Sequence, residues 1–501
     1  MTATTQPLRP RASLTPGALG ALAGLTAATG AAVAYSPVLA GCLVFLAAFA
    51  VVTVLWPDFA TLIVVGLLFA NVPGVAIQNH GAPVIVGAIV PLLLVVPAAA
   101  LWWRGERLIA TPAFVLLVVL LLCELASTLL SDHQTEALDK MRTFIFEAAI
   151  LYFLASNVIR TPDVLRKVLW VVLGATTFLA LLTIFQDTTR TYFSFYGGFA
   201  LPDPSYLIGK ATEPRASGPV GDPNYYAQIL IVANCIGLVF AWRSPTPVQR
   251  ILALGATAAV TYAILLTFSR GTMLALFFVI LVLAAMRYFK GWQILTMILA
   301  IVVVFASVPA FSERLSSISA VGSATEQTGT AADADQSAQG RATEMLAAFH
   351  VFQDHPAFGV GPANFPLYYR AYAEQIGGEI HDSVAGGAHK GEQAERQAHN
   401  MLISQLAELG IIGTTAFVAI LIVTLRALMT TRRRLLREGD RDRADLATIL
   451  LLAVLSYLFC GIFLTLAFER YFWLLLGIAG GATSLALRTP PGPAPRRRAG
   501  G

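Results

Sequence analysis

Long apolar segments separated by short polar connections repeat along almost the whole chain. Each approaches the roughly 20 residues that an α-helix needs to cross about 30 Å of hydrocarbon. The pattern predicts an all-α, polytopic integral membrane protein with about 12–14 transmembrane helices. We place the spans near residues 18–35, 37–56, 58–77, 84–103, 110–130, 143–159, 165–186, 223–242, 249–267, 271–286, 292–311, 400–427, 446–466 and 470–487. The first apolar segment has no convincing signal-peptide cleavage site, so we expect it to be retained as a helix.

The lysines and arginines orient these spans, because basic residues are retained on the cytoplasmic side of short connections. With Arg9 and Arg11 inside, every second connection should be basic, and the sequence follows this alternation. The basic residues assigned to the inside are Arg104, Arg107, Arg160, Arg166, Lys167, Arg243, Arg250, Arg287, Lys290, Arg432, Arg433, Arg434, Arg437, Arg441, Arg443, Arg488, Arg496, Arg497 and Arg498. Both termini are therefore predicted to be cytoplasmic.

The same assignment divides the chain into four parts. These are an N-terminal transmembrane bundle (1–311, with an outer loop at 187–222), a large external loop (312–399), C-terminal transmembrane helices (400–487) and a basic cytoplasmic tail (488–501). Residues 312–340 are rich in Ser, Thr, Ala and Gly, which predicts a flexible stretch. From Arg341 onward, apolar residues at helical spacing and a following turn predict a partly helical cap over the membrane.

Composition supports the membrane assignment and excludes several functions. Of 501 residues, 56% are hydrophobic and 13% are charged, and the mean hydropathy is +0.70. A soluble globular protein is about one-quarter charged. The net charge of +5 follows from the basic connections and predicts no nucleic-acid partner. The four cysteines lie in apolar segments and predict neither a disulfide nor a metal site; they are Cys42, Cys123, Cys235 and Cys460.

All histidines of the chain fall in segments assigned to the outer face. They are His80, His133, His350, His355, His381, His389 and His399. The cost of placing polar groups in hydrocarbon explains why they lie in loops. It does not explain why they share one side, so we expect any chemistry to take place on the outer face.

Three sites on this face carry side chains suited to chemistry. In the segment RASGPVGDPNYYAQ, Arg215 ends a loop, and Asp222 and Asn224 open a helix whose free N–H groups they can cap. Arg270 occupies a very short turn between two spans, and His399 directly precedes a span. Each has a simpler explanation, namely a role at a helix start or, for the arginines, contact with lipid phosphate. Both arginines nevertheless lie where the positive-inside rule disfavours them.

Considered together, these residues suit a diphosphate carried on a polyprenyl lipid. A guanidinium matches phosphate oxygens with paired donors and keeps its charge, and a neutral histidine can take a proton from an attacking hydroxyl. We predict no metal and no cofactor. Of two D-x-D patterns, Asp333-Ala-Asp335 lies in the flexible stretch and Asp440-Arg-Asp442 in a basic cytoplasmic segment.

The motifs resemble those of the bacterial O-antigen ligase and O-antigen polymerase superfamily. His399-Asn400, nine residues, Gly410, two residues and Gly413 match the ligase pattern of H-[NSQ], nine residues, G, two residues and G, T or Y. Arg215 before the sequence GDPN, the Ser-Arg-Gly turn at Arg270, and DHPAFGVGPANF at 354–365 complete the resemblance.

The resemblance implies metal-independent, inverting glycosyl transfer at the external or periplasmic face of the bacterial cytoplasmic membrane. The donor would be a glycan on undecaprenyl diphosphate, and the acceptor a hydroxyl of a second glycan or a lipid. By analogy, Arg215 and Arg270 would hold the diphosphate and His399 would act as the base. Arg341 would contact donor or glycan, and Asn400 would bind substrate beside His399. Gly410 and Gly413 would allow close helix packing.

Within the superfamily, the number of spans slightly favours a polymerase, and the spacing after His399 favours a ligase that transfers glycan to lipid A-core. The sequence leaves open whether the protein pairs with a chain-length regulator. A different class, a transporter or flippase for lipid-linked sugars, would use ionisable residues within spans, and the candidates are Glu124, Glu147 and Glu408. The sequence shows no clear internal repeat of the kind found in many transporters. A structural scaffold would need no charged outer cluster.

Overall fold

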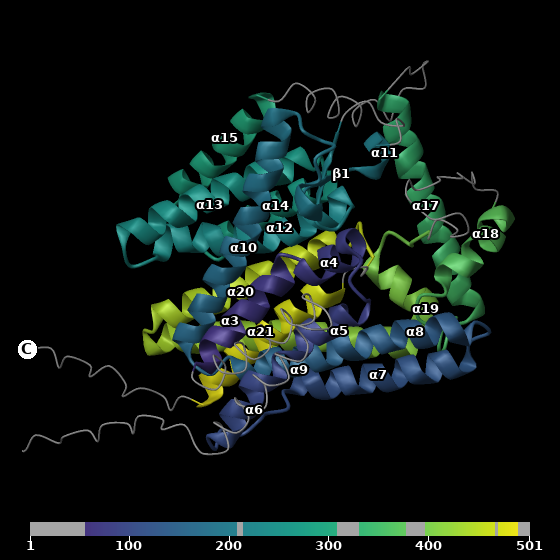
Figure 1. Ribbon diagram of the computed structural model, residues 1–501, viewed down its shortest axis with the longest axis horizontal. Coiled ribbons are helices and arrows are strands. Elements are labelled where there is room, and N and C mark those ends of the chain that lie inside the picture. The colour runs from purple at the N-terminus through teal and green to yellow at the C-terminus, as the bar shows by residue number, and fades with distance from the viewer. Residues whose placement is uncertain (1–55, 208–213, 308–329, 377–395, 466–468, 489–501) are drawn as a thin grey trace, which may run out of the picture.

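A computed structural model describes residues 56–207, 214–307, 330–376, 396–465 and 469–488 (Figure 1). Its helices are α3 (Pro57–Phe69), α4 (Val72–His80), α5 (Ile85–Leu92), α6 (Val95–Trp103), α7 (Pro112–Leu130), α8 (Gln134–Phe144), the π-helix η1 (Ile145–Ile150), α9 (Leu151–Val158), α10 (Pro162–Thr189), η2 (Tyr196–Gly198), α11 (Pro204–Leu207), α12 (Pro223–Arg243), α13 (Pro247–Leu266), α14 (Arg270–Ala285), α15 (Gly291–Ser307), α17 (Thr330–Asp354), α18 (Phe365–Gln375), α19 (Met401–Glu438), α20 (Arg441–Cys460) and α21 (Glu469–Arg488). The strands β1 (Leu201–Pro202) and β2 (Ala216–Gly218) pair antiparallel.

The described residues confirm the all-α, polytopic class. Eight helices are long and apolar enough to cross a membrane, and a ninth span results if the bent pair α3 and α4 is counted as one. The spans predicted at 165–186, 223–242 and 249–267 agree with α10, α12 and α13 to within three residues at each end. The first two predicted spans lie almost entirely outside the described residues, as does the basic tail.

Several helices begin with the same capping device, in which proline follows a polar N-cap. The hydroxyls of Thr111, Thr161 and Thr246 each accept an N–H bond from the third residue of the helix they precede. Asp222 caps α12 in the same way. Because proline has no N–H and a fixed φ, it fits the first helical turn, and the polar cap satisfies one of the free donors.

Among the described residues, several spans depart from regular α-helix. The pair α3 and α4 is bent by 49° at Asn71, whose φ is 55°. Residues 145–150 form the π-helix inside the span from Gln134 to Val158. The helix α19 is broken at Gly410, with φ 63° and ψ −168°. Periodicity alone did not predict these irregularities, because each leaves the apolar character of the segment unchanged.

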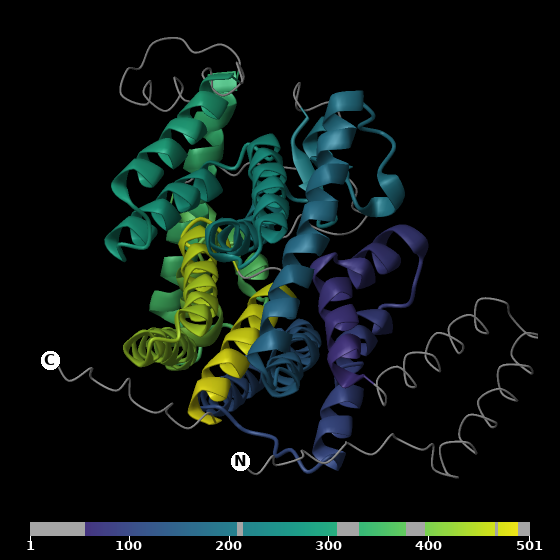
Figure 2. The ribbon, with the colours of Figure 1, turned by 90° about the vertical axis from the view of Figure 1, so that its left-hand side faces the viewer.

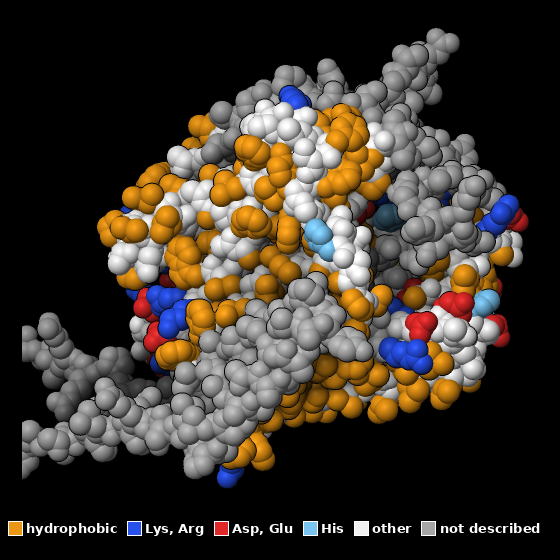
Figure 3. All heavy atoms as spheres, viewed as in Figure 1, with side chains coloured by type: hydrophobic (Ala, Val, Ile, Leu, Met, Phe, Trp, Pro, Cys, Tyr) orange, Lys and Arg blue, Asp and Glu red, His pale blue; other side chains and the backbone are white. Residues whose placement is uncertain are grey.

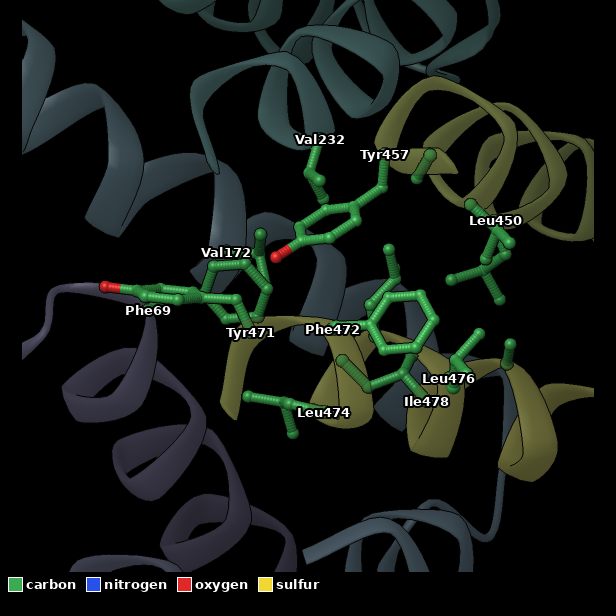
Figure 4. Close-up of a cluster of buried hydrophobic side chains, with 14 of the residues drawn as sticks. Phe69, Val172, Val232, Leu450, Tyr457, Tyr471, Phe472, Leu474, Leu476 and Ile478 are labelled. Atoms are coloured by element: carbon green, nitrogen blue, oxygen red, sulfur yellow. The ribbon is translucent and has the colours of Figure 1, made fainter. Parts of the chain in front are cut away.

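The transmembrane helices pack around α12 and α20, with α21 against α9. Figure 4 shows Phe69, Tyr457, Tyr471 and Phe472 among the buried side chains of this core. A Cβ added at Gly477 would lie 2.8 Å from the Cβ of Ala155. Small residues on α21 therefore allow the backbones to approach closely, as is usual in membrane bundles.

The two ends of the bundle differ in what covers them. Figures 1 and 2 show the long helices side by side, with α17 and α18 across one end. In Figure 3 hydrophobic side chains cover much of the flank of the bundle, and charged ones gather at its ends. We name the end under α17, where α12, α14 and α19 begin, the His399 face. The opposite end, where α19 ends and α20 begins, is the Arg432 face.

The segment 312–399, which we predicted to be an external loop, is more helical in its described part than its composition predicted. The predicted helix from Arg341 and the short helix after the turn correspond to α17 and α18. The helix α17, however, begins at Thr330, so the part of the predicted flexible stretch from 330 to 340 is helical. Alanine is the best helix former, and it is frequent in this segment. Its contribution to helix formation was underestimated because the segment also contains Ser, Thr and Gly.

Candidate active site

His399 is held at the start of α19 by the residue that follows it. The Oδ1 atom of Asn400 accepts N–H bonds from Leu402 and Ile403, both at 3.0 Å. Its Nδ2 atom donates to the carbonyl of Ile462 at 3.0 Å. His399 itself has a φ of 46°, so the chain turns sharply before it enters the helix. These contacts give Asn400 a capping role, and its predicted contact with substrate stays a prediction.

The break at Gly410 is where the loop after α17 crosses α19. A Cβ at Gly410 would lie 2.3 Å from the carbonyl oxygen of Ala357, and a Cβ at Gly359 would lie 2.3 Å from the carbonyl carbon of Glu408. Both glycines have positive φ. Only glycine fits such close backbone approach in this conformation. The glycines of α19 were predicted to permit helix packing; Gly410 in fact contacts the backbone of the loop.

Backbone hydrogen bonds fasten this crossing on both sides of the break. The N–H of Val360 donates to the carbonyl of Ala407 at 3.0 Å, and the N–H of Ile411 donates to that of Pro356 at 2.9 Å. The hydroxyl of Ser127 on α7 donates to the Phe358 carbonyl at 2.6 Å. The motif at 354–365 therefore satisfies the backbone groups that the broken helix leaves open, and fixes the helical turn that presents His399.

Glu344 on α17 connects His399 to Arg396. Its Oε2 atom lies 3.3 Å from Nε2 of His399, and its Oε1 atom lies 3.1 Å from Nη1 of Arg396. Glu344 is only 3% exposed. Burial raises the pKa of its carboxyl, and the neighbouring Arg396 and Arg341 oppose that rise. This carboxylate is thus the shared partner of a histidine and a guanidinium.

His399 is neutral at physiological pH. Burial lowers its pKa from 6.5 to about 4, and the positive charges of Arg341 and Arg396 contribute. Since a carboxylate can only accept, the Nε2 atom beside Glu344 carries the hydrogen, and Nδ1 carries the lone pair. The Nδ1 atom is buried and has no hydrogen-bond partner among the described residues. The ring therefore holds a basic atom that the protein itself does not use.

Arg341 and Arg270 bring positive charge to the same place. Burial lowers the pKa of Arg341, the charge of Arg270 lowers it further, and Asp222 and Glu344 oppose this. Arg270 is the exposed first residue of α14. The structure thus places the starts of α12 and α14, the middle of α17 and His399 within electrostatic reach of one another.

The turn that carries Arg270 is tightly packed. Phe268 has a φ of 52°, and Ser269 is the N-cap of α14. A Cβ at Gly271 would lie 3.0 Å from the ring of Phe463. The close contact with Phe463 gives a physical reason for the glycine of the Ser-Arg-Gly motif.

Arg215 fastens the outer loop to this turn. Its Nε atom donates to the carbonyl of Thr267 at 3.0 Å, Nη2 to Oδ1 of Asn224 at 3.4 Å, and Nη1 lies 3.5 Å from Asp203. The Oδ1 atom of Asp222 accepts from the N–H groups of Asn224 and Tyr225, at 2.7 and 3.0 Å. The predicted helix cap at Asp222 is confirmed, and Arg215 lies beside the turn that precedes Arg270.

Sequence reasoning missed Glu344, Arg396 and Tyr225. The hydroxyl of Tyr225 lies 2.6 Å from both the side-chain oxygen of Gln397 and the hydroxyl of Thr465, which links α12 to the segment before His399. Glu344 follows Arg341 by three residues, so both lie on one helix face, and that spacing is the signal that could have found it. Arg396 lies three residues before His399 without any helical pattern.

The D-x-D pattern at Asp440-Arg-Asp442 lies away from this arrangement. Asp440 caps α20 by accepting the N–H of Arg443 at 3.1 Å, and Asp442 lies 3.6 Å from Arg166 at the Arg432 face. The side chains of Asp333 and Asp335 lie outside the described part of the structure. Within the described ranges, no group of three or more His, Cys, Asp or Glu side chains could hold a metal ion.

Comparison with known proteins supports the resemblance. A family model for O-antigen ligase matches residues 254–418. The matched segment contains Arg270, Arg341, Glu344, Arg396 and His399, and it ends after the broken turn of α19. Arg215 precedes it. No curated protein matches the chain significantly.

Proposed function

Since residues 254–418 are of the O-antigen ligase type, we propose that this membrane protein transfers glycan from a polyprenyl-diphosphate donor to an acceptor hydroxyl, with inversion and without a metal. The observation that carries the proposal is the neutral His399, whose unpartnered Nδ1 atom lies near the buried, charged Arg341. A base and an anion site are thus held close together at the His399 face, which we assign to the outer side of the bacterial cytoplasmic membrane.

The first step in this proposal is proton transfer. The acceptor hydroxyl donates its proton to Nδ1 of His399 as its oxygen attacks the anomeric carbon of the donor sugar. The bond from that carbon to the diphosphate oxygen breaks, and the diphosphate leaves with the electron pair. Attack opposite the leaving group inverts the anomeric centre. Glu344 accepts a hydrogen bond from the Nε2–H group throughout the reaction. It therefore orients the ring and stabilises the imidazolium that forms when Nδ1 takes the proton.

Arg270 and Arg341 are proposed to hold the diphosphate. Burial and the positive charge of Arg270 both lower the pKa of Arg341, because like charges repel in a partly desolvated site. A diphosphate between them would relieve that repulsion and would gain charge as the bond breaks, so the interaction strengthens in the transition state. Arg215 contacts Thr267 and Asn224, and we propose that it sets the position of the Arg270 turn beside the same anion.

We propose polymerization of lipid-linked repeats first and ligation to a lipid acceptor second. The second candidate is kept because the matching family is described as O-antigen ligase. In both reactions the donor and the chemistry at His399 are the same, and only the acceptor differs. The residues that recognise the acceptor would therefore lie away from the diphosphate site.

Complementation of a surface-polysaccharide deletion strain tests the function. Wild type, His399→Ala, Arg270→Ala, Arg341→Ala and a control, His350→Ala on the same helix as Arg341, are compared at matched membrane expression. We expect only wild type and the control to restore glycan. Accumulated single repeats on the lipid would indicate a polymerase, and accumulated long chains a ligase. Normal glycan from the His399 variant would reject His399 as the base and would favour a transporter of lipid-linked sugar.

A further inference from the structure

At the Arg432 face, a cavity opens between α10, α12, α13 and α20. It encloses about 330 Å³ of space, counting its open mouth. Its charged and polar lining consists of Arg166, Arg243, Ser244, Gln249, Asp442 and Asp445. This site is at the opposite end of the bundle from His399, so the proposed transfer reaction does not use it. Figure 3 shows charged side chains of both signs gathered at this end.

The ion pairs between the two arginines and the two aspartates of the cavity are long. Tyr288 also contacts one of these pairs, since its hydroxyl donates to Asp445 and Arg243 lies over its ring at 4.7 Å. The Nη2 atom of Arg166 lies 3.6 Å from Asp442, and the Nε atom of Arg243 lies 3.9 Å from Asp445. Charge-assisted hydrogen bonds between such groups are usually about 2.7–2.9 Å long. Both pairs join different helices, and both can admit a polar group between the partners.

A third acceptor lines the same cavity. The Oε1 atom of Gln249 is buried and has no hydrogen-bond partner within the part of the chain that the structure describes. An unsatisfied buried acceptor costs about 1–3 kcal/mol, so a donor that reached it would be bound favourably. With Asp442 and Asp445, the cavity presents three acceptors, which matches the three donors of a primary ammonium.

The remaining wall of the cavity is apolar and aromatic. It includes Val239, Phe240 and Leu446, and the ring of Trp170 stacks on Phe240 with a centroid distance of 4.9 Å. Tryptophan is enriched at the level of lipid headgroups because its ring is amphipathic. The cavity thus combines an interfacial aromatic wall with charged groups of both signs.

We propose that this cavity binds the headgroup of a zwitterionic phospholipid that carries a primary amine, of the phosphoethanolamine type. Arg166 and Arg243 take the phosphate, and Asp442, Asp445 and Gln249 take the ammonium. The glycerol and upper acyl carbons lie against Trp170 and Leu446. An anionic headgroup would satisfy the arginines alone and would bring negative charge towards two aspartates.

Native mass spectrometry of the full-length protein, purified in a neutral detergent, tests the proposal. Phosphatidylethanolamine, phosphatidylcholine and phosphatidylglycerol are titrated separately. We expect phosphatidylethanolamine to bind about tenfold more tightly than phosphatidylcholine, whose methylated ammonium cannot donate to the three acceptors. Equal binding of these two lipids would overturn the proposal.

Variants of Asp442 and Arg166 separate the contribution of the lipid ammonium from that of the lipid phosphate. Asp442 is largely exposed, and within the described residues its ion-pair partner Arg166 lies 3.6 Å away, so Asp442→Asn should fold normally. It should weaken phosphatidylethanolamine about tenfold and shift the preference towards phosphatidylglycerol. Arg166→Gln should weaken both lipids. The control Arg437→Gln, an exposed arginine at the end of α19, should weaken neither.

Two results would reject the site as a lipid site. If Asp442→Asn leaves the lipid preference unchanged, or if Arg437→Gln acts like Arg166→Gln, binding depends on the general charge of this face. If free glycerophosphoethanolamine displaces the lipid at equal concentration, the cavity recognises a soluble zwitterion and the acyl contacts contribute nothing.

Discussion

Glu344 and His399 form a buried pair in which the carboxylate, 3.3 Å from Nε2, determines which nitrogen of the ring is basic. The carboxylate comes from the middle of α17 and the histidine from the start of α19. Their meeting depends on the crossing of the loop 354–361 over the break at Gly410, since that crossing sets where α17 ends relative to α19. The geometry of the base is therefore built by the external loop together with the membrane helix.

The low pKa of His399 predicts an unusual pH profile for transfer. The charged ring is disfavoured, so His399 remains an active base as the pH falls below 6.5 and becomes protonated only near its pKa of about 4. We expect kcat/KM, measured with purified protein and lipid-linked donor, to stay level from pH 8 to about pH 5 and then to fall. The control His350→Gln should keep the same profile. An acidic limb centred between pH 6 and 7 would contradict the proposed environment of the ring.

The same shift makes a prediction about stability. The folded state binds fewer protons at His399 than the unfolded state does, so stability should decrease as the pH falls from about 6.5 to 4 and level off below that. The loss attributable to this residue is up to about 3 kcal/mol. His399→Gln should flatten this part of the curve in thermal unfolding of the detergent-solubilised protein. If the variant shows the same dependence of stability on pH, other groups are responsible for it.

Glu344 is predicted to act by orienting His399. In Glu344→Ala the ring loses its acceptor, and we expect kcat to fall about 10–100-fold, the range known for groups that orient metal-bound histidines. The KM for donor should change little. Glu344→Gln keeps an acceptor for Nε2 and should recover most of the rate. Because Arg396 loses its partner in both variants, thermal unfolding must be measured in parallel, and equal rate losses in both would point to a charge effect.

The parts of this structure that could be predicted share one property, which is that their signals are local. Apolar runs of sufficient length located α10, α12 and α13, and the Asp-Pro-Asn segment located the cap of α12. The spacing from His399 to Gly410 marked the site. Glu344 was missed because its spacing from Arg341 places the two residues on one helix face but does not show whether the carboxylate is buried. The fold supplies that information by bringing α17 to α19.

Gly410 offers a direct test of the crossing. Gly410→Ala would place a Cβ 2.3 Å from the Ala357 carbonyl, at a φ of 63° and ψ of −168° that only glycine adopts readily. We expect a loss of at least about 2 kcal/mol, together with loss of transfer. The control is Gly174→Ala, because Gly174 lies within α10 with nothing within 4 Å of the added carbon, and alanine is the better helix former. Normal activity of Gly410→Ala would show that the crossing does not position His399.

A second ion pair, which is half-buried, allows the transferase and the transporter to be distinguished. The Nη2 atom of Arg470 lies 2.6 Å from Glu147, and its Nη1 atom reaches Oδ1 of Asn71, at the bend between α3 and α4, at 3.5 Å. Arg470 is far from Glu147 in the sequence, so the sequence showed Glu147 as an isolated charge within a span. Paired in this way, it holds the π-helix and α21 to the bent span.

If the ion pair between Glu147 and Arg470 is structural, each single variant should be less stable than the double variant. Glu147→Gln or Arg470→Gln alone leaves one half-buried charge uncompensated, which costs about 3–5 kcal/mol. The double variant removes both charges and should recover much of the loss, both in thermal unfolding and in glycan made by the complemented strain. A transporter that moves a coupling ion through Glu147 would instead lose function in the double variant at normal stability. That outcome would reject the transferase as the sole activity.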